Sequence, residues 1–276
     1  MTQAPRRRDP RVVAGQYLGA AALTLLAFLW GFTVLAFGWP DTLGLGPVMQ
    51  DFHAFHITGG MVREGTAAGA YAEDTLRPVQ AAATGTDKFM PWTYPPHFNL
   101  VAAALALLPL WAGYALFAGG GLIAYALVLR ALAGRWSGTV LGAMFPMLAI
   151  CVGTGQNGLW VGAVAGLLAM VPGRLAGVPL ALLTLKPHFL PGVGLLWLLR
   201  REGAAILTAA ALVAGLLVLA TLVQGAGIWT AFLGGMTEAG DFLAAGAYRF
   251  ARMASVYAAA HAAGLPATAA LALQGM

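Results

Sequence analysis

Two charged residues in this sequence have the types and the settings of groups that could carry chemistry, Asp51 and Lys186. The carboxylate of Asp51 could act as a general base that takes a proton from a hydroxyl. A helix-capping role is the alternative, since aspartate is a favoured cap. Lys186 lies between two apolar stretches and precedes Pro187. Because a lysine in apolar surroundings is costly, we expect it to meet an anionic group such as a lipid phosphate. Snorkelling to an interface is the alternative.

His53 and His56 follow Asp51 at a spacing that could place both rings on one face of a helix. With Asp51 they could ligate a metal ion, but the pattern is a weak signal because neutral histidines are common at interfaces. We therefore predict no bound metal and no cofactor. We expect both histidines to line a site that binds a molecule with hydroxyl groups.

Arg249 and Arg252, three residues apart, form a further basic pair. A guanidinium group can bind a phosphate through two parallel hydrogen bonds. We expect these arginines to bind a phosphate together with Lys186, and anchoring of their loop at lipid headgroups is the alternative.

Several neutral groups are suited to the hydroxyls of a sugar or an acceptor. Gln156 and Asn157 could hydrogen-bond such hydroxyls, or could cap the helix that follows them. Tyr94 and His188 are further candidates for the same side of the site. For Tyr94 the alternative is a place in the aromatic belt at a membrane surface.

The composition indicates that lipid surrounds most of the chain. Hydrophobic residues make up 60% of the sequence and charged residues 9%, with a mean hydropathy of +0.78. A soluble domain usually carries about 25% charged residues. The basic residues behind the net charge of +5 are dispersed around apolar segments, which favours membrane topology over nucleic-acid binding. The single cysteine, Cys151, excludes an intrachain disulfide and a cysteine-based metal cluster.

We therefore predict an all-α polytopic transmembrane protein with one membrane domain, residues 1–276. Four arginines precede the first apolar stretch, so its N-terminus should be cytoplasmic. The stretch after it holds six of the ten acidic residues. The predicted parts are a first span (12–38), an extracytoplasmic loop (39–97), a helical core (98–223), a second extracytoplasmic loop (224–257) and the start of a further span (258–276). We expect residues 258–276 to form one apolar helix.

Two segments of the predicted core should not cross the membrane completely. If residues 98–108 form a re-entrant or interfacial segment, the later basic clusters all fall on the cytoplasmic side, as the positive-inside rule requires. The twelve helical steps from Arg174 to Lys186 rise only about 18 Å, less than the hydrocarbon thickness of roughly 30 Å. Lys186 would then lie below the outer surface, at the tip of a hairpin broken by Pro187, where a broken helix must line a cavity or be buried in protein.

Five stretches, taken in order, resemble glycosyltransferase family 87, the bacterial polyprenyl-phosphate-dependent, mannosyltransferase-like membrane enzymes of GT-C architecture. They are DFHAFHITGGMVREGTAAGAY (51–71), PWTYPPHFNLVAAALALLPLWAGYALF (91–117), GQNGLW (155–160), LAGVPLALLTLKPHFLPG (175–192) and RMASVYAAAHAAGLPATAALALQ (252–274). Their common order is more specific than any single motif.

The resemblance implies that Asp51 is the catalytic base, because the family's proposed base is an aspartate of the first extracytoplasmic loop. It also implies a polyprenyl-phosphate-linked hexose donor, a lipid or glycan acceptor, inverting transfer without a metal, and a bacterial inner (plasma) membrane location. Such a transferase needs charge stabilisation at the departing phosphate. Lys186, with Arg249 or Arg252, could supply it.

The sequence departs from the family pattern in two ways. His53 and His56 lie where apolar or aromatic residues are more usual, so the acceptor side could differ. Family members are usually longer, which leads us to expect a C-terminally truncated member that could be inactive or accessory. A lipid-linked sugar transporter or flippase remains the alternative function, since transporters also place polar residues on broken helices. We find no inverted internal repeat to support it.

Overall fold

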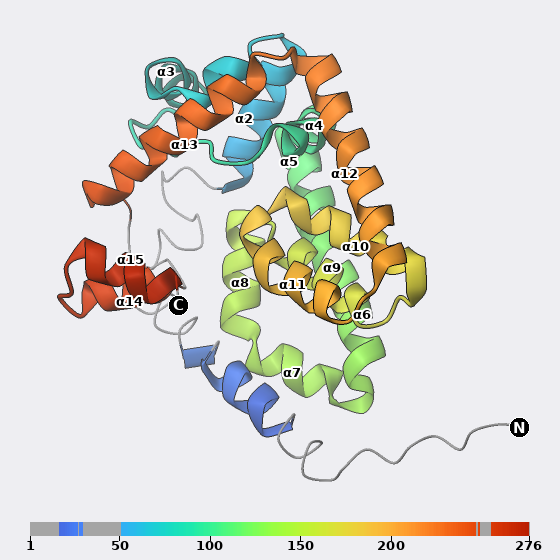
Figure 1. Cartoon of the computed structure of the whole chain (residues 1–276). Coiled ribbons are helices and arrows are strands. Elements are labelled where there is room, and N and C mark those ends of the chain that lie inside the picture. Colours follow the sequence, from blue (N-terminus) through green and yellow to red (C-terminus); the bar gives the residue numbers. More distant parts are fainter. Residues whose placement is uncertain (1–16, 27, 30–50, 247, 249–254, 276) are drawn as a thin grey trace, which may run out of the picture.

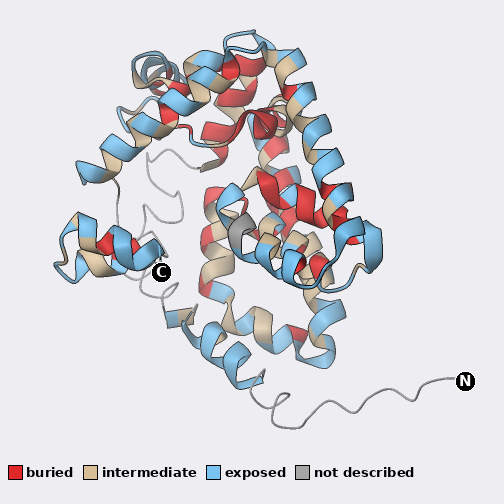
Figure 2. Ribbon diagram, viewed as in Figure 1, coloured by how far each residue is buried: buried red, intermediate tan, exposed pale blue. Residues whose placement is uncertain are grey.

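The computed structural model describes residues 17–26, 28–29, 51–246, 248 and 255–275, and every regular element in these ranges is a helix (Figure 1). The prediction of an all-α protein is confirmed for this part of the chain. Most of the predicted first span, residues 12–38, lies outside the described residues, although Tyr17–Leu26 is helical. Buried residues gather in α2, α4 and α10, whereas much of α12 and α13 is exposed (Figure 2).

Helix α2 (Asp51–Arg63) forms the centre of the larger core. It begins with an acidic and ends with a basic residue, which suits the partial charges at the two ends of a helix. Phe52 and Phe55 are almost completely buried and lie on the face that meets the rest of the core. Asp51 and His53 are only partly buried. The helix therefore anchors itself through its aromatic face and carries its polar groups beside that anchor.

Helix α4 (Pro96–Leu105) packs closely against α2, and Gly59 permits the approach. A Cβ added at Gly59 would overlap the carbonyl oxygen of Ala102. Nη1 of Arg63 donates to the carbonyl of Ala106 at 2.7 Å, which satisfies a carbonyl just beyond the end of α4. With ten residues α4 rises only about 15 Å, so it is too short to span a bilayer. Its placement as a re-entrant or interfacial segment stays a prediction.

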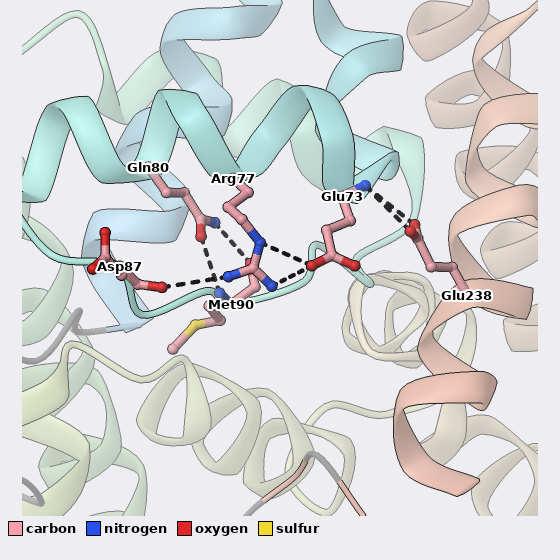
Figure 3. Close-up of polar contacts among 6 residues, drawn as sticks. All are labelled: Glu73, Arg77, Gln80, Asp87, Met90 and Glu238. Atoms are coloured by element: carbon pink, nitrogen blue, oxygen red, sulfur yellow. Dashed lines mark hydrogen bonds and ion pairs between the residues drawn. The ribbon is translucent and has the colours of Figure 1, made fainter. Parts of the chain in front are cut away.

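The predicted first extracytoplasmic loop is largely helical in its described part. The 3₁₀ helix η2 (Ala67–Tyr71) leads into α3 (Glu73–Thr84), and the chain then returns to α4. Figure 3 shows how α3 holds the returning segment. The buried amide of Gln80 donates to the carbonyl of Met90 at 2.7 Å and accepts from its N–H at 3.0 Å.

Arg77 on α3 adds an outer layer to the same attachment (Figure 3). Its guanidinium pairs with Glu73 one helical turn earlier and donates to the carbonyl of Asp87 at 3.3 Å. The same group lies 4.6 Å from the ring centroid of Phe89. Glu238 on α13 (Ile228–Ala244) accepts from the N–H of Glu73. The start of α3 is thereby attached to a helix far away in the sequence.

In the described part of the chain, two helical stretches are long and apolar enough to cross a membrane, Leu110–Ala143 and Gly203–Gln224. The second is α12; the first comprises α5 (Leu110–Tyr114), a π-helical turn (Ala115–Gly119), α6 (Gly120–Ala133), η4 (Gly134–Trp136) and α7 (Ser137–Ala143). Gly134 has a φ of +54°, and α7 leaves in a different direction from α6 (Figure 1). Large apolar side chains on both stretches are exposed, as lipid contact requires. Apart from Gln224, both stretches lie within the predicted helical core, residues 98–223.

Glycines set the packing of the remaining core helices. Helix α9 (Gly158–Leu168) lies against α6, with the indole of Trp160 over Gly121. Helix α8 (Phe145–Thr154) precedes α9, and α10 (Gly177–Leu182) follows the short helix η5 (Gly173–Ala176). Helix α10 approaches α12 so closely that a Cβ added at Gly177 would overlap the Ala205 carbonyl.

The predicted break at Lys186-Pro187 is present. Helix α10 continues as η6 (Leu183–Leu185), and the chain then leaves helical geometry at Lys186, which has φ −135° and ψ 78°. A residue before proline is disfavoured in the helical region, so the sequence explains the break. Helical structure resumes in η7 (Pro187–Phe189) and α11 (Leu190–Leu199).

The C-terminal segment differs from the prediction of one continuous apolar helix over residues 258–276. The chain forms two short helices that pack together, α14 (Val256–Ala262) and α15 (Ala267–Gly275). Gly264 has a φ of +88°, outside the helical region. Pro266 cannot donate a backbone hydrogen bond to a preceding turn. These two residues divide the segment, which apolar composition alone did not reveal.

We predict that Gly59→Ala destabilises the fold, because the new methyl group overlaps the Ala102 carbonyl. Forced overpacking of this kind costs about 1–3 kcal/mol. Thermal unfolding in detergent, followed by size-exclusion chromatography, measures the effect. Gly60→Ala is the matched control, because a Cβ at that position meets nothing within 4 Å. Equal melting temperatures for the two variants would contradict the close packing of α2 on α4.

Candidate active site

Asp51 begins α2 beside the turn between α8 and α9. Gly155 in that turn has a φ of +68°, and a Cβ added there would lie 2.5 Å from Cβ of Phe52 and 3.2 Å from the Tyr114 ring. Glycine fits this position because other residues rarely adopt such a φ and because a side chain would collide with Phe52. The turn therefore packs directly on the residue after Asp51. This contact brings Asn157 and the aspartate to one part of the core.

Tyr94 lies beside Asp51 within an aromatic cluster. Its ring stacks on Phe98 at 4.4 Å between centroids and meets Phe55 edge-on at 5.3 Å. Burial raises the pKa of the Tyr94 hydroxyl, the Asp51 carboxylate raises it further, and a hydrogen bond with the Asn157 side chain lowers it. Burial is the largest of these effects, so the phenol stays protonated and can donate a hydrogen bond near Asp51.

Lys186 faces the same region from the broken hairpin. Its ammonium interacts electrostatically with the carboxylate of Asp51 and with Cys151. The side chain is half-buried. His188 is close enough to Lys186 for the two groups to influence one another. A carboxylate from α2 and an ammonium from the hairpin thus approach one site from elements that are far apart in the sequence.

A buried amide holds the segment that carries Tyr94. Asn99 is completely buried, and its Oδ1 accepts from Nε1 of Trp92 at 2.9 Å. The Tyr71 hydroxyl lies 3.4 Å from the same oxygen and donates its proton to the carbonyl of Tyr94 at 2.8 Å. Its Nδ2 donates to Oε1 of Gln224 at 2.7 Å. Nε2 of Gln224 in turn donates to the carbonyl of Pro96 at 2.9 Å. The network joins the segment before α4 to the end of α12.

The structure brings together four residues that the sequence singled out, Asp51, Tyr94, Asn157 and Lys186. Asn157 occupies the N-cap position of α9, but its side chain makes no capping hydrogen bond. It bonds to Tyr94 instead, and its Oδ1 is buried without a hydrogen-bond partner among the described residues. Capping, the alternative considered for this side chain, is therefore wrong.

Three other candidates, His56, His53 and Gln156, differ in the hydrogen bonds that their side chains make. Nε2 of His56 lies 2.9 Å from the carbonyl oxygen of Leu108, so this nitrogen is hydrogen-bonded to the backbone. Burial and then the neighbouring His56 lower the pKa of His53, whose Nδ1 has no partner in the described part of the chain. Oε1 of Gln156 accepts from the N–H of Asn157 at 3.0 Å.

Arg249 and Arg252 lie outside the described residues, so their expected contact with a phosphate stays a prediction. Within residues 17–26, 28–29, 51–246, 248 and 255–275, no group of three or more histidines, cysteines or carboxylates could hold a metal ion. The considered triad of Asp51, His53 and His56 is therefore not assembled.

Sequence reasoning missed two buried polar residues in the first turns of α4. His97 and Asn99 lie inside a stretch used for the family resemblance, yet neither was singled out. Both are polar residues within an otherwise apolar segment, and buried polar groups need partners. That signal could have identified them as structural anchors, but not the distant partners they contact.

The model for glycosyltransferase family 87 matches residues 92–276, more than half of the chain. The chain belongs to glycosyltransferase family 87. The match includes Tyr94, Asn157 and Lys186 but begins after Asp51. The searches of curated proteins and of solved structures found no match.

Family membership confirms the resemblance seen in the sequence. Together with the apolar helices, it indicates a membrane glycosyltransferase with a sugar donor and an acceptor as substrates. The match does not extend to the residues of α2, so the role of Asp51 depends on its position in the fold and on the resemblance of residues 51–71.

We predict that Asn99→Leu destabilises the family 87 chain, because the Trp92 N–H and the Gln224 carbonyl lose their partners. Each buried polar group left unsatisfied costs about 1–3 kcal/mol. Thermal unfolding in detergent provides the measurement. Thr237→Val serves as the control, since Thr237 is exposed and its hydroxyl bonds only within α13. If both variants melt like the parent protein, the network is not a structural anchor.

Proposed function

We propose that this family 87 protein transfers a mannose-like hexose from a polyprenyl-phosphate donor to an acceptor hydroxyl, with inversion at the anomeric carbon. The observation that carries the proposal is the approach of Asp51 and Lys186 to a single site. We further propose a GT-C architecture in a bacterial inner membrane, with a cytoplasmic N-terminus and the site on the extracytoplasmic side. The concentration of acidic residues after the first apolar stretch supports this orientation.

Asp51 is proposed as the general base. Inverting transfer needs one base that removes the proton from the acceptor hydroxyl as the hydroxyl attacks the sugar. The partly buried carboxylate of Asp51 is suited to this role. The Tyr94 phenol stays protonated beside it and cannot compete as a base. A lipid or glycan hydroxyl that enters next to Asp51 would also meet His53 and the turn at Gln156.

Lys186 is proposed to stabilise the departing phosphate. Negative charge grows on the leaving oxygen as the glycosidic bond breaks, and a fixed cation lowers the energy of that transition state. A broken hairpin places the cation at its tip, as half-helices do in other membrane sites. Arg249 and Arg252 could add charge on the same side, and His188 lies next to Lys186.

The broken hairpin also fits a transporter or flippase, which would bind a lipid-linked sugar without transferring it. The proximity of a carboxylate to the ammonium favours transfer, because binding of an anionic donor requires no base. The two functions separate experimentally. A transporter retains its binding and movement of the donor when the base is removed, and it forms no glycosylated product.

We predict that Asp51→Asn lowers turnover by about 10²–10⁴-fold, the usual contribution of a general base. The assay measures transfer of labelled mannose from polyprenyl-phosphate mannose to the lipids and glycans of membranes that contain the protein. Affinity for polyprenyl phosphate should change little. Asp74→Asn, an exposed position on α3, is the matched control. Turnover near that of the parent protein would remove Asp51 as the base.

We predict that Lys186→Met weakens the binding of polyprenyl phosphate by about tenfold or more, since a hydrogen bond from a charged group contributes roughly 1.5–3 kcal/mol. Equilibrium binding to the purified protein measures the dissociation constant. Lys88→Met provides the matched control, because Lys88 is exposed in the segment after α3. Unchanged affinity in a Lys186→Met protein of normal melting temperature would exclude the phosphate role.

A further inference from the structure

His97 connects the segment that carries Tyr94 to the helix that carries Lys186. Its ring is buried in the first turn of α4. Nε2 lies 3.1 Å from the backbone carbonyl oxygen of Thr184 and 3.2 Å from its Oγ1. Thr184 precedes Lys186 by two residues. The contact therefore reaches the last turn before the break in the hairpin.

The surrounding hydrogen bonds determine which nitrogen of His97 carries the proton. Oγ1 of Thr184 already donates its only proton to the carbonyl of Ala181 at 2.7 Å. Both Thr184 oxygens can then only accept, so the hydrogen must lie on Nε2 of His97. Burial lowers the pKa of His97, which favours the neutral ring. Nδ1 consequently bears a lone pair and is buried without a partner among the described residues.

The last turn before Lys186 needs such an external donor. Carbonyl groups at the end of a helix lack the N–H groups of a following turn. Pro187 supplies no N–H to this region. The N–H of Lys186 bonds to the carbonyl of Leu183 at 3.0 Å, and the Thr184 carbonyl receives its hydrogen bond from His97. Without His97 this end of the helix would be free to rotate or fray.

We propose that His97 is a positioning residue that fixes the Lys186 ammonium for the donor phosphate. It acts through Thr184 and holds the hairpin tip against the start of α4. Because Tyr94 precedes His97 by three residues, the same segment then sets both sides of the site. The inference rests on the phosphate-binding role proposed for Lys186.

Two substitutions separate the function of Nε2 from the bulk of the ring. The amide nitrogen of a glutamine can reach the position of Nε2, whereas that of an asparagine corresponds to Nδ1. His97→Asn should weaken the binding of polyprenyl phosphate by roughly 3- to 10-fold, the effect of one lost hydrogen bond. It should raise KM for polyprenyl-phosphate mannose more than it lowers kcat. His97→Gln should restore most of the affinity.

A double substitution tests whether His97 acts through Lys186. In a Lys186→Met background, His97→Asn should weaken polyprenyl phosphate binding no further, because the group it positions is gone. Additive losses would overturn the proposal, as would equal losses for His97→Gln and His97→Asn. If His97→Asn does not fold, His97→Met, which fills much of the space of the ring but carries no donor, takes its place. This variant removes the hydrogen bond to the Thr184 carbonyl, and an affinity loss that Lys186→Met abolishes is expected; unchanged affinity overturns the proposal.

The results also distinguish this proposal from the function on which it rests. If Lys186→Met leaves the affinity unchanged, the phosphate role of Lys186 is wrong and His97 has nothing to position. If Lys186→Met weakens binding but His97→Asn does not, the proposed function stands and only the positioning by His97 fails.

Discussion

The arrangement of the site depends on the hydrogen bonds of one completely buried side chain, the amide of Asn99. A buried polar group without partners costs free energy, so the chain must bring a donor and an acceptor to this point. Trp92 provides the donor and Gln224 the acceptor, and the Tyr71 hydroxyl beside them donates to the carbonyl of Tyr94. The bond from Gln224 back to Pro96 closes the network at the start of α4. The segment before and within the first turn of α4 is thereby fixed in position.

From this fixed segment, contacts extend to both sides of the proposed site. On one side Tyr94 is within electrostatic range of Asp51, the proposed base for the acceptor hydroxyl, and its pKa is lowered by a hydrogen bond with Asn157. His97 reaches Thr184 on the other, next to the lysine proposed for the phosphate. A transferase needs its base and its phosphate-binding group at a set separation, because the bond that forms and the bond that breaks share one carbon atom. A single rigid segment between them meets that need.

Hydropathy and helix-breaking residues predicted much of the fold. The apolar stretches at Leu110–Ala143 and Gly203–Gln224 and the break at Lys186-Pro187 follow from local sequence. The division at Gly264 was missed, since the apolar composition there resembled a continuous helix. The orientation of Asn157 toward Tyr94 and the contact of His97 with Thr184 depend on residues distant in sequence, which a local pattern cannot reveal. Candidate residues could thus be named, but not the network that assembles them.

The central claim is that the donor lies between the aspartate of α2 and the lysine of the broken hairpin. An experimental structure of the Asp51→Asn variant with polyprenyl-phosphate mannose tests it most directly, because that substitution should allow binding without turnover. The account predicts the phosphate against the Lys186 ammonium and the anomeric carbon facing residue 51, with the side opposite the phosphate open to an acceptor. A donor phosphate bound away from Lys186, or a sugar turned away from residue 51, would contradict it.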